Sequence, residues 1–210
     1  MSASRIASLT YAEGFVPEEP AVEQARARGA ELGATPIGTG GGAALRLLAA
    51  AVGAHHVVEI GAGAGSSGLW LLAGMPAEGV LTTIEVEPEH ARAAKQAYAA
   101  AGIVGQRTRV ITGAALDVLP RMNDASYDLV HVDADKEGYP EYVEHGIRLL
   151  RPGGVLALDN MLWHDTVADP AQRDARTTML RDLGKQLRDD ERLVTALLPV
   201  GDGLLTAVKR

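Results

Sequence analysis

The sequence predicts an α/β fold, with a doubly wound, mostly parallel sheet that ends in an antiparallel hairpin. From His55 onward, short runs rich in β-branched residues alternate with segments of helical length, a pattern typical of βαβ units in a parallel sheet. Near the C-terminus, two apolar runs flank Gly201-Asp202-Gly203, and a short turn of this composition joins antiparallel strands. A chain of 210 residues suits one domain, so we expect a single domain over residues 1–210.

The predicted elements follow one another in a regular order. The N-terminal part, residues 1–53, contains two predicted helices at 21–32 and 43–52, which the stretch GATPIGTGGG separates. The α/β core, residues 54–210, has predicted strands at 55–60, 80–85, 108–112, 127–133 and 155–159, with predicted helices near 67–75, 88–101, 115–122 and 138–150. A polar helix near 171–189 and the two hairpin strands complete the chain.

Composition excludes several classes of protein. Apolar residues make up 47% and charged residues 22%, so the chain is too hydrophobic to be disordered. Lys and Arg number 20 against 27 Asp and Glu, and the net charge of −7 without a basic cluster argues against a nucleic-acid partner. The absence of cysteine excludes disulfides and thiolate zinc sites. No apolar run is long enough for a signal peptide or a membrane span, so we expect a cytoplasmic protein without a membrane partner.

A glycine-rich loop follows the first predicted strand, in the segment VVEIGAGAGSSG. Gly61, Gly63 and Gly65 allow a tight turn and a close approach of a ligand to the backbone. The helix that begins after them offers free N–H groups and the positive end of its dipole. Gly63, Gly65 and Gly68 also fit the G-x-G-x-x-G pattern of dinucleotide-binding proteins, and a turn that merely needs glycine remains an alternative.

Two acidic residues narrow the choice of ligand. Glu59 lies two positions before the first glycine, where a carboxylate would oppose a pyrophosphate but would suit a sulfonium or an amino group. Glu85 ends the second strand, where a carboxylate can accept both hydroxyls of a ribose. Together they favour S-adenosylmethionine over NAD. An ion pair or a helix cap is the alternative role for Glu85.

Polar residues also follow the fourth and fifth strands. Asp133 and Asp159 are expected at the carboxyl edge of neighbouring strands, and Asn160 adds a third oxygen. Two carboxylates and an amide oxygen suit Mg²⁺, Mn²⁺ or Ca²⁺ and would leave about three positions of an octahedral ion open. The alternative is that these residues cap the next segment or begin a turn. His131, on the same strand face as Asp133, is interpreted as a packing residue.

The segments VVEIGAGAGSSGLWLL, TTIEVEPEH, DLVHVDADKEGYPEY and RPGGVLALDNMLW resemble the metal-dependent class I O-methyltransferases, the group of caffeoyl-CoA and catechol O-methyltransferases. The resemblance runs from about Ile37 to the C-terminus. It implies a Rossmann-like class I methyltransferase fold with a seven-stranded sheet and N-terminal lid helices, S-adenosylmethionine as methyl donor, and a homodimer. It also implies a divalent metal, Mg²⁺ above Mn²⁺ or Ca²⁺, at Asp133, Asp159 and Asn160.

The resemblance assigns further roles by position. It implies cofactor contacts at Ile37, Thr39, Glu59, Gly61, Ala62, Gly65, Ser67, Glu85, Ala115 and Asp135. Lys136 matches the lysine proposed as catalytic base or phenolate stabiliser, and Asp133 belongs to both the catalytic and the substrate-side set. Tyr139 and Trp163 fall where the family places substrate-side aromatics. The chain departs from the family in the glycine-rich stretch GTGGG (38–42) and in having Ala115 and Leu116 where the animal catechol enzymes have polar residues.

The predicted function is therefore S-adenosylmethionine-dependent O-methylation of a hydroxyl on a small, vicinal-dihydroxy aromatic acceptor, with help from a divalent metal. Because a phenol has a pKa of about 10, a dication that lowers this pKa would supply the nucleophile, and Lys136 could take the proton. An exposed loop lysine, or an ion pair with Asp135, is the alternative role of Lys136. The alternative functions are an NAD-dependent oxidoreductase and a non-catalytic S-adenosylmethionine-binding protein, while the acidic charge opposes an RNA methyltransferase.

Overall fold

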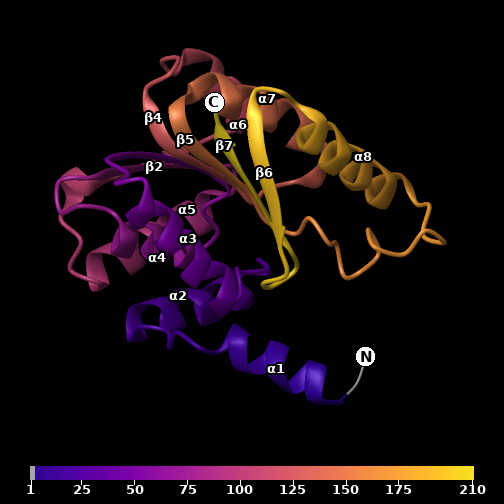
Figure 1. Cartoon of the computed structure of the whole chain (residues 1–210). Helices are drawn as coiled ribbons and strands as arrows, with labels where there is room; N and C mark the ends of the chain where they lie inside the picture. Colours follow the sequence, from indigo (N-terminus) through magenta and orange to yellow (C-terminus); the bar gives the residue numbers. More distant parts are fainter. Residues whose placement is uncertain (1–2) are drawn as a thin grey trace.

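The computed structural model describes residues 3–210, and within them seven strands form one sheet (Figure 1). The strand order is β3-β2-β1-β4-β5-β7-β6. The first five strands pair in parallel, and β7 runs antiparallel to both β5 and β6. Their bounds are β1 (His56–Ile60), β2 (Val80–Glu85), β3 (Thr108–Thr112), β4 (Tyr127–Val132), β5 (Leu150–Leu158), β6 (Leu193–Leu198) and β7 (Leu204–Lys209). This arrangement confirms the predicted doubly wound sheet and its C-terminal hairpin.

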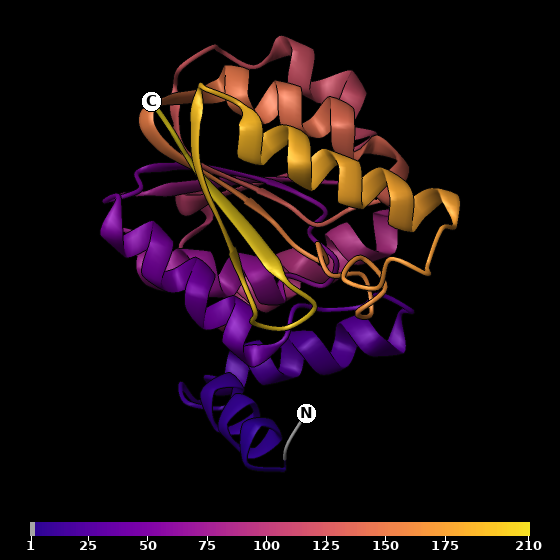
Figure 2. The same cartoon turned by 45° about the vertical axis from the view of Figure 1, so that its right-hand side comes forward.

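Helices cover both faces of this sheet (Figure 2). One layer contains α2 (Pro20–Glu31), α3 (Thr39–Ala51), α4 (Ser66–Gly74) and α5 (Pro88–Ala100). At the outer edge of this layer, α1 (Ala3–Glu13) packs on α3. The other layer contains α6 (Ala115–Val118), α7 (Tyr139–Leu149) and α8 (Ala175–Asp189). Short 3₁₀ turns lie at η1 (Gly105–Arg107), η2 (Leu119–Arg121) and η3 (Lys136–Gly138). No helix within residues 3–210 is both long enough and apolar enough to cross a membrane.

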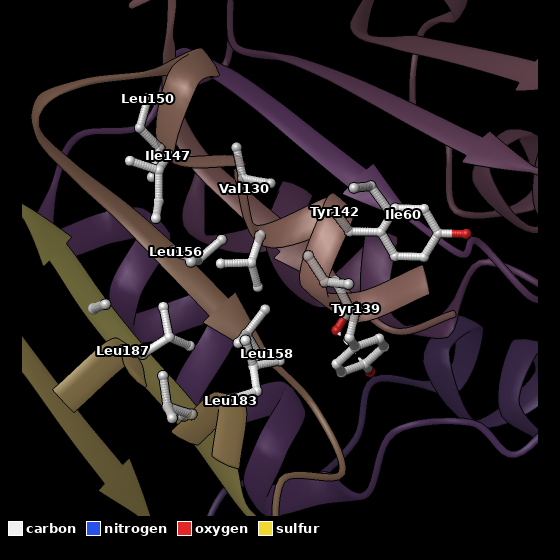
Figure 3. Close-up of a cluster of buried hydrophobic side chains, with 14 of the residues drawn as sticks. Ile60, Val130, Tyr139, Tyr142, Ile147, Leu150, Leu156, Leu158, Leu183 and Leu187 are labelled. Carbon is white, nitrogen blue, oxygen red and sulfur yellow. Dashed lines mark hydrogen bonds between the residues drawn. The ribbon is translucent and has the colours of Figure 1, made fainter. Parts of the chain in front are cut away.

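Alternate residues of the central strands belong to two separate apolar cores, one on each face of the sheet. Val57 contributes to the core beneath α2–α5, and its neighbour Val58 contributes to the core beneath α7 and α8. Figure 3 shows the second core, in which Leu156 and Leu158 of β5 lie close to side chains of α7 and α8. Because β1 is buried on both faces, its run of apolar residues is nearly continuous, as in other parallel sheets.

The glycine-rich stretch before α3 differs from its prediction. It was expected to separate two helices, but α3 begins at Thr39 and includes Gly40, Gly41 and Gly42. A Cβ atom on Gly42 would overlap the indole ring of Trp70 in α4. The glycines therefore serve the close packing of two helices, which outweighs their poor intrinsic helix propensity.

The ends of other helices and strands also differ from the predicted ones. The predicted helix at 115–122 is divided into α6 and η2 near Pro120, whose ring prevents regular continuation. The polar helix begins at Ala175 rather than near 171, because the Asp174 side chain accepts a hydrogen bond from the backbone N–H of Thr177 and caps it. Strand β5 starts early, at Leu150, with an irregularity in its pairing to β4. Helix α1 has no counterpart among the predicted elements.

Candidate active site

A cleft of about 640 Å³ lies at the carboxyl end of the parallel strands, where ligands bind in open α/β sheets. Its walls come from the segments that follow β1, β2, β3, β4 and β5 and from the stretch between α2 and α3. The lining residues are Ala34, Thr35, Pro36, Ile37, Ile60, Gly61, Ala62, Gly63, Ala64, Ser66, Ser67, Ile84, Glu85, Val86, Glu87, His90, Gly113, Ala114, Ala115, Leu116, Asp133, Ala134, Asp135, Lys136, Glu137, Tyr142, Asn160, Trp163, His164 and Arg176.

The loop after β1 needs glycine for its shape. Gly61 and Gly65 have φ angles of 92° and 95°, in the left-handed region that side chains disfavour. A Cβ atom on Gly61 would also overlap the backbone oxygen of Asp133, so this loop and the end of β4 are in direct contact. The turn brings the N-terminus of α4 to the cleft, with Ser66 and Ser67 in its first turn.

Glu85 is held in a defined orientation at the end of β2. One carboxylate oxygen accepts a hydrogen bond from the Gly63 N–H at 2.8 Å, and the other accepts one from the Glu87 N–H at 2.9 Å. The ring of His90 lies 3.9 Å from the same carboxylate. Each oxygen has a further lone pair, so the carboxylate can accept two hydroxyl groups of a ligand without giving up its own contacts.

Glu59 occupies a different position from the one expected for a ligand contact. Its side chain is fully buried and does not line the cleft. It accepts a hydrogen bond from the Ser67 hydroxyl at 2.6 Å and lies 3.6 Å from the imidazole of His131, its partner residue on β4. Burial alone would lower the pKa of His131, but the Glu59 charge, together with Asp133 and Asp159, raises this pKa above its ordinary value.

The three candidate metal ligands meet at the ends of β4 and β5. The Asp133 side chain is 17% exposed, and Asn160, with a φ of 58°, lies beside it in the cleft wall. Asp159 is only 4% exposed. Burial and the nearby Asp133 charge raise the pKa of Asp159 to about 6.

This donor set fits a hard divalent ion, because a cation would offset the repulsion between two close carboxylates. Within residues 3–210, no group of three or more His, Cys, Asp and Glu side chains is placed to hold a metal. The candidate set therefore depends on the amide oxygen of Asn160 as its third ligand.

Lys136 lies between the candidate metal ligands and a buried tyrosine. Its ammonium group is 3.4 Å from Asp133 Oδ1, 3.0 Å from the Ala134 carbonyl oxygen and 2.6 Å from the Tyr139 hydroxyl. These contacts replace the ion pair with Asp135 that the sequence left open. Asp135 instead accepts hydrogen bonds from the Tyr142 hydroxyl and the Gly138 N–H.

The structure brings most of the predicted site residues together. Eleven of the predicted residues line the cleft: Ile37, Gly61, Ala62, Ser67, Glu85, Ala115, Asp133, Asp135, Lys136, Asn160 and Trp163. The residues predicted for the site that do not line it are Thr39, Glu59, Gly65, Asp159 and Tyr139. Tyr139 departs most from expectation, since its ring is fully buried rather than open to a substrate.

Several residues that line the cleft had no predicted role, and His90, Tyr142 and Arg176 are three of them. His90 and Tyr142 lie on α5 and α7, in segments whose helical pattern gave no sign of a ligand. Arg176 lies in the first turn of α8, 5.2 Å from the centre of the Trp163 ring, and forms an ion pair with Glu137. Only the folded chain brings α8 to this cleft, so sequence spacing could not have identified Arg176.

Comparison with known proteins gives a consistent result. A family model described as O-methyltransferase matches residues 18–210. The Mycobacterium tuberculosis protein named "Probable O-methyltransferase Rv1220c" is 49% identical over 199 residues, which cover 95% of this chain and 89% of that protein. A solved structure from Corynebacterium glutamicum is 33% identical with a TM-score of 0.89, and the alignment covers 99% of this chain and 97% of that one.

A second solved structure adds a bound ligand. The O-methyltransferase TomG from Streptomyces achromogenes, involved in tomaymycin synthesis, was solved in complex with S-adenosylmethionine. It is 30% identical with a TM-score of 0.86, and the alignment covers 100% of this chain and 99% of that one. The family resemblance found in the sequence motifs is thereby confirmed: this chain belongs to the O-methyltransferase family.

Proposed function

We propose that this enzyme transfers the methyl group of S-adenosylmethionine to a hydroxyl of a small, vicinal-dihydroxy aromatic compound, with a divalent metal bound at Asp133, Asp159 and Asn160. One observation carries the proposal: a single cleft is lined by the glycine loop and Glu85 at one side and by Asp133, Asn160 and Lys136 at the other. The complex of TomG with S-adenosylmethionine supports the choice of donor.

The side chains divide the work between two ligands. Glu85 would accept the ribose hydroxyls, and the apolar Ile37 and Ala115 would flank the donor. Because Glu59 is buried behind Ser67, its effect on a cationic donor would act through charge and through the Ser67 hydroxyl rather than by direct contact. Trp163 offers an aromatic face to the acceptor.

Alignment and charge account for the chemistry. When bound, the donor supplies an electrophilic methyl group and a divalent ion favours the ionised form of the acceptor hydroxyl. Lys136 has its side-chain nitrogen 3.4 Å from Asp133 Oδ1, where it would stabilise negative charge that develops on an acceptor oxygen. The cleft would hold donor and acceptor together, and alignment of this kind supplies much of the rate gain in such a transfer.

The proposal is tested by methyl transfer to a panel of catechols and caffeoyl compounds, followed by mass spectrometry with Mg²⁺ or with a chelator. We expect a methylated product that disappears with the chelator. Product that survives the chelator would contradict the metal role. Binding calorimetry with S-adenosylhomocysteine and with NAD separates this function from the oxidoreductase, and binding without turnover on any acceptor would favour the non-catalytic alternative.

The metal assignment makes a sharper prediction. Asp159→Ala should lower Mg²⁺-dependent turnover by about a hundredfold or more, because metal assistance supplies several kcal/mol of the barrier reduction. The affinity for S-adenosylhomocysteine, measured by calorimetry, should stay within about threefold, since Asp159 does not line the cleft. Equal loss of both would contradict the separate roles. The homodimer stays a prediction, which analytical ultracentrifugation of the purified chain would check.

A further inference from the structure

We propose that Tyr139 is a positioning residue for the methyl-transfer site, and that its hydroxyl fixes the Lys136 ammonium group against Asp133. This assignment differs from the substrate contact that the family resemblance implied for Tyr139. It rests on the proposed function only for the role of Lys136, since the contact between Tyr139 and Lys136 is a property of the fold itself. Tyr139 does not touch the cleft, so it acts through Lys136.

The Tyr139 hydroxyl contacts three parts of the site at once. It lies 2.6 Å from Lys136 Nζ, 3.0 Å from the carbonyl oxygen of Asp159 and 3.3 Å from the carbonyl oxygen of Val132. Val132 is the last residue of β4 and directly precedes Asp133, while Asp159 directly follows β5. One buried oxygen atom therefore joins the lysine to the strand ends that carry two candidate metal ligands.

Hydrogen-bond chemistry sets the direction of this chain of contacts. Carbonyl oxygens only accept, and a tyrosine hydroxyl has one proton to donate. That proton goes to a carbonyl, with Asp159 the nearer of the two, so the hydroxyl oxygen accepts from the Lys136 ammonium group. The resulting order is Lys136 to Tyr139 to the Asp159 backbone. Lys136 also donates to the Ala134 carbonyl, which restrains its flexible stem a second time.

Packing alone does not explain a tyrosine at this position. The ring is fully buried in the core beneath α7, at the same end as Tyr142 and beside Leu158 (Figure 3). Phenylalanine would fill the same volume, and its ring would still lie close to the ammonium group, which is now 4.4 Å from the ring centre. What phenylalanine lacks is the acceptor for Lys136 and the donor for the end of β5.

The first test is Tyr139→Phe, with Tyr127→Phe as a matched control. Tyr127 begins β4 at the opposite end of the strand, does not line the cleft, and also packs against the same core. We expect Tyr139→Phe to lower kcat by about tenfold or more, the size typical of one hydrogen bond to a charged group, with KM for donor and acceptor within about twofold. Tyr127→Phe should leave kcat within about twofold. An unchanged kcat in Tyr139→Phe would overturn the proposal.

A double-mutant cycle with Lys136→Met separates positioning from general support of the fold. If Tyr139 acts through Lys136, then adding Tyr139→Phe to Lys136→Met should change kcat by less than about twofold. If the two losses multiply, Tyr139 acts independently of the lysine and the proposal fails. Urea unfolding of each variant identifies any loss that arises from misfolding.

An NMR measurement tests the contact even if no acceptor is found for the enzyme. Buried, hydrogen-bonded ammonium protons exchange slowly, so ¹⁵N-lysine labelling should give a Lys136 signal that Lys136→Met removes. Lys209, which donates to the carbonyls of Ile147 and Leu150, serves as the internal reference. Tyr139→Phe should broaden or shift the Lys136 signal and leave that of Lys209 unchanged. A Lys136 signal that is missing from the parent protein, or unaffected by Tyr139→Phe, would overturn the proposal; failure of methyl transfer alone would not.

Discussion

Glu85 is oriented by the protein backbone itself, because the N–H groups of Gly63 and Glu87 fix its two oxygens separately. Such preorganisation lowers the entropy cost of binding. Glu85→Gln should therefore weaken S-adenosylhomocysteine binding by about tenfold, since an amide cannot accept at both positions while keeping both backbone contacts. Calorimetry measures the change, with Glu89→Gln, an exposed residue of α5 outside the cleft, as the control. Equal affinity in Glu85→Gln would contradict the ribose role.

A second carboxylate supports the fold at the other end of the strands. Asp128 accepts hydrogen bonds from the N–H groups of His55 and His56 and from Arg151, so that it links the starts of β1, β4 and β5. Burial would raise the pKa of Asp128, but these donors outweigh it and lower the pKa below the ordinary value. The stabilisation is thus present above the ordinary carboxyl pKa and is lost as pH falls through the lowered value.

Asp128→Asn should lower the free energy of unfolding by about 1–3 kcal/mol at pH 7, because it removes the charge that strengthens these bonds. The difference from the parent protein should begin to shrink as the pH falls below about 4, the ordinary carboxyl pKa, and should be lost as the pH falls through the lowered pKa of Asp128. Urea unfolding at pH 7 and near pH 3 measures both values. A difference that does not depend on pH would show that the charge of Asp128 contributes nothing.

At the scale of elements, the close contact between α3 and α4 requires a residue without a side chain, Gly42, on α3. Gly42→Ala would place a Cβ atom against the buried indole of Trp70, and overpacking of this kind costs about 1–3 kcal/mol of unfolding free energy. Gly105→Ala, in the η1 turn, is the control, because no atom lies within 4 Å of the added Cβ. Thermal unfolding should show a lower Tm for Gly42→Ala only. A Tm equal to that of the control would mean that the helices separate without cost.

The sequence predicts elements better than their ends. The seven strands were all expected, because β-branched runs between turn residues reflect a local physical preference. The start of α3 was not, because GTGGG resembles a turn until Trp70 is known to lie against it. Such a boundary is determined by packing between helices that are far apart in the sequence. Local helix propensity carries no information about that packing.

In the candidate site too, some features could be predicted from the sequence and others depend on contacts in the folded chain. Strand order and alternation place Asp133, Asn160 and Glu85 at one edge of the sheet, so their gathering in one cleft follows from the pattern. The burial of Glu59 and Tyr139 could not be predicted from strand order and alternation. A position near a strand end does not determine whether a side chain points to the cleft or to the core. Their three-dimensional partners, Ser67 and Lys136, decide that.

At the scale of the whole molecule, the cleft is built from segments spread between Ala34 and Arg176. The N-terminal wall near Ile37 is tied to the rest by Glu13 of α1, which has one oxygen 2.9 Å from the Gly40 N–H and the other 3.0 Å from the Gly201 N–H. Gly40 lies in the first turn of α3, and Gly201 lies in the turn between β6 and β7. One side chain thus links α1 to α3 and to the C-terminal hairpin.

Removal of this link should loosen α1 without unfolding the core. Glu13→Ala should speed amide hydrogen exchange across residues 3–13 by about tenfold, since two hydrogen bonds are lost, while the global Tm falls by less than about 3 °C. Glu31→Ala is the matched control, because Glu31 pairs only with Arg28 of its own helix among the ion pairs within residues 3–210. Exchange that rises equally throughout the protein would mean that α1 and the core unfold as one unit. Unchanged exchange in residues 3–13 would mean that apolar packing on α3, rather than Glu13, holds α1 in place.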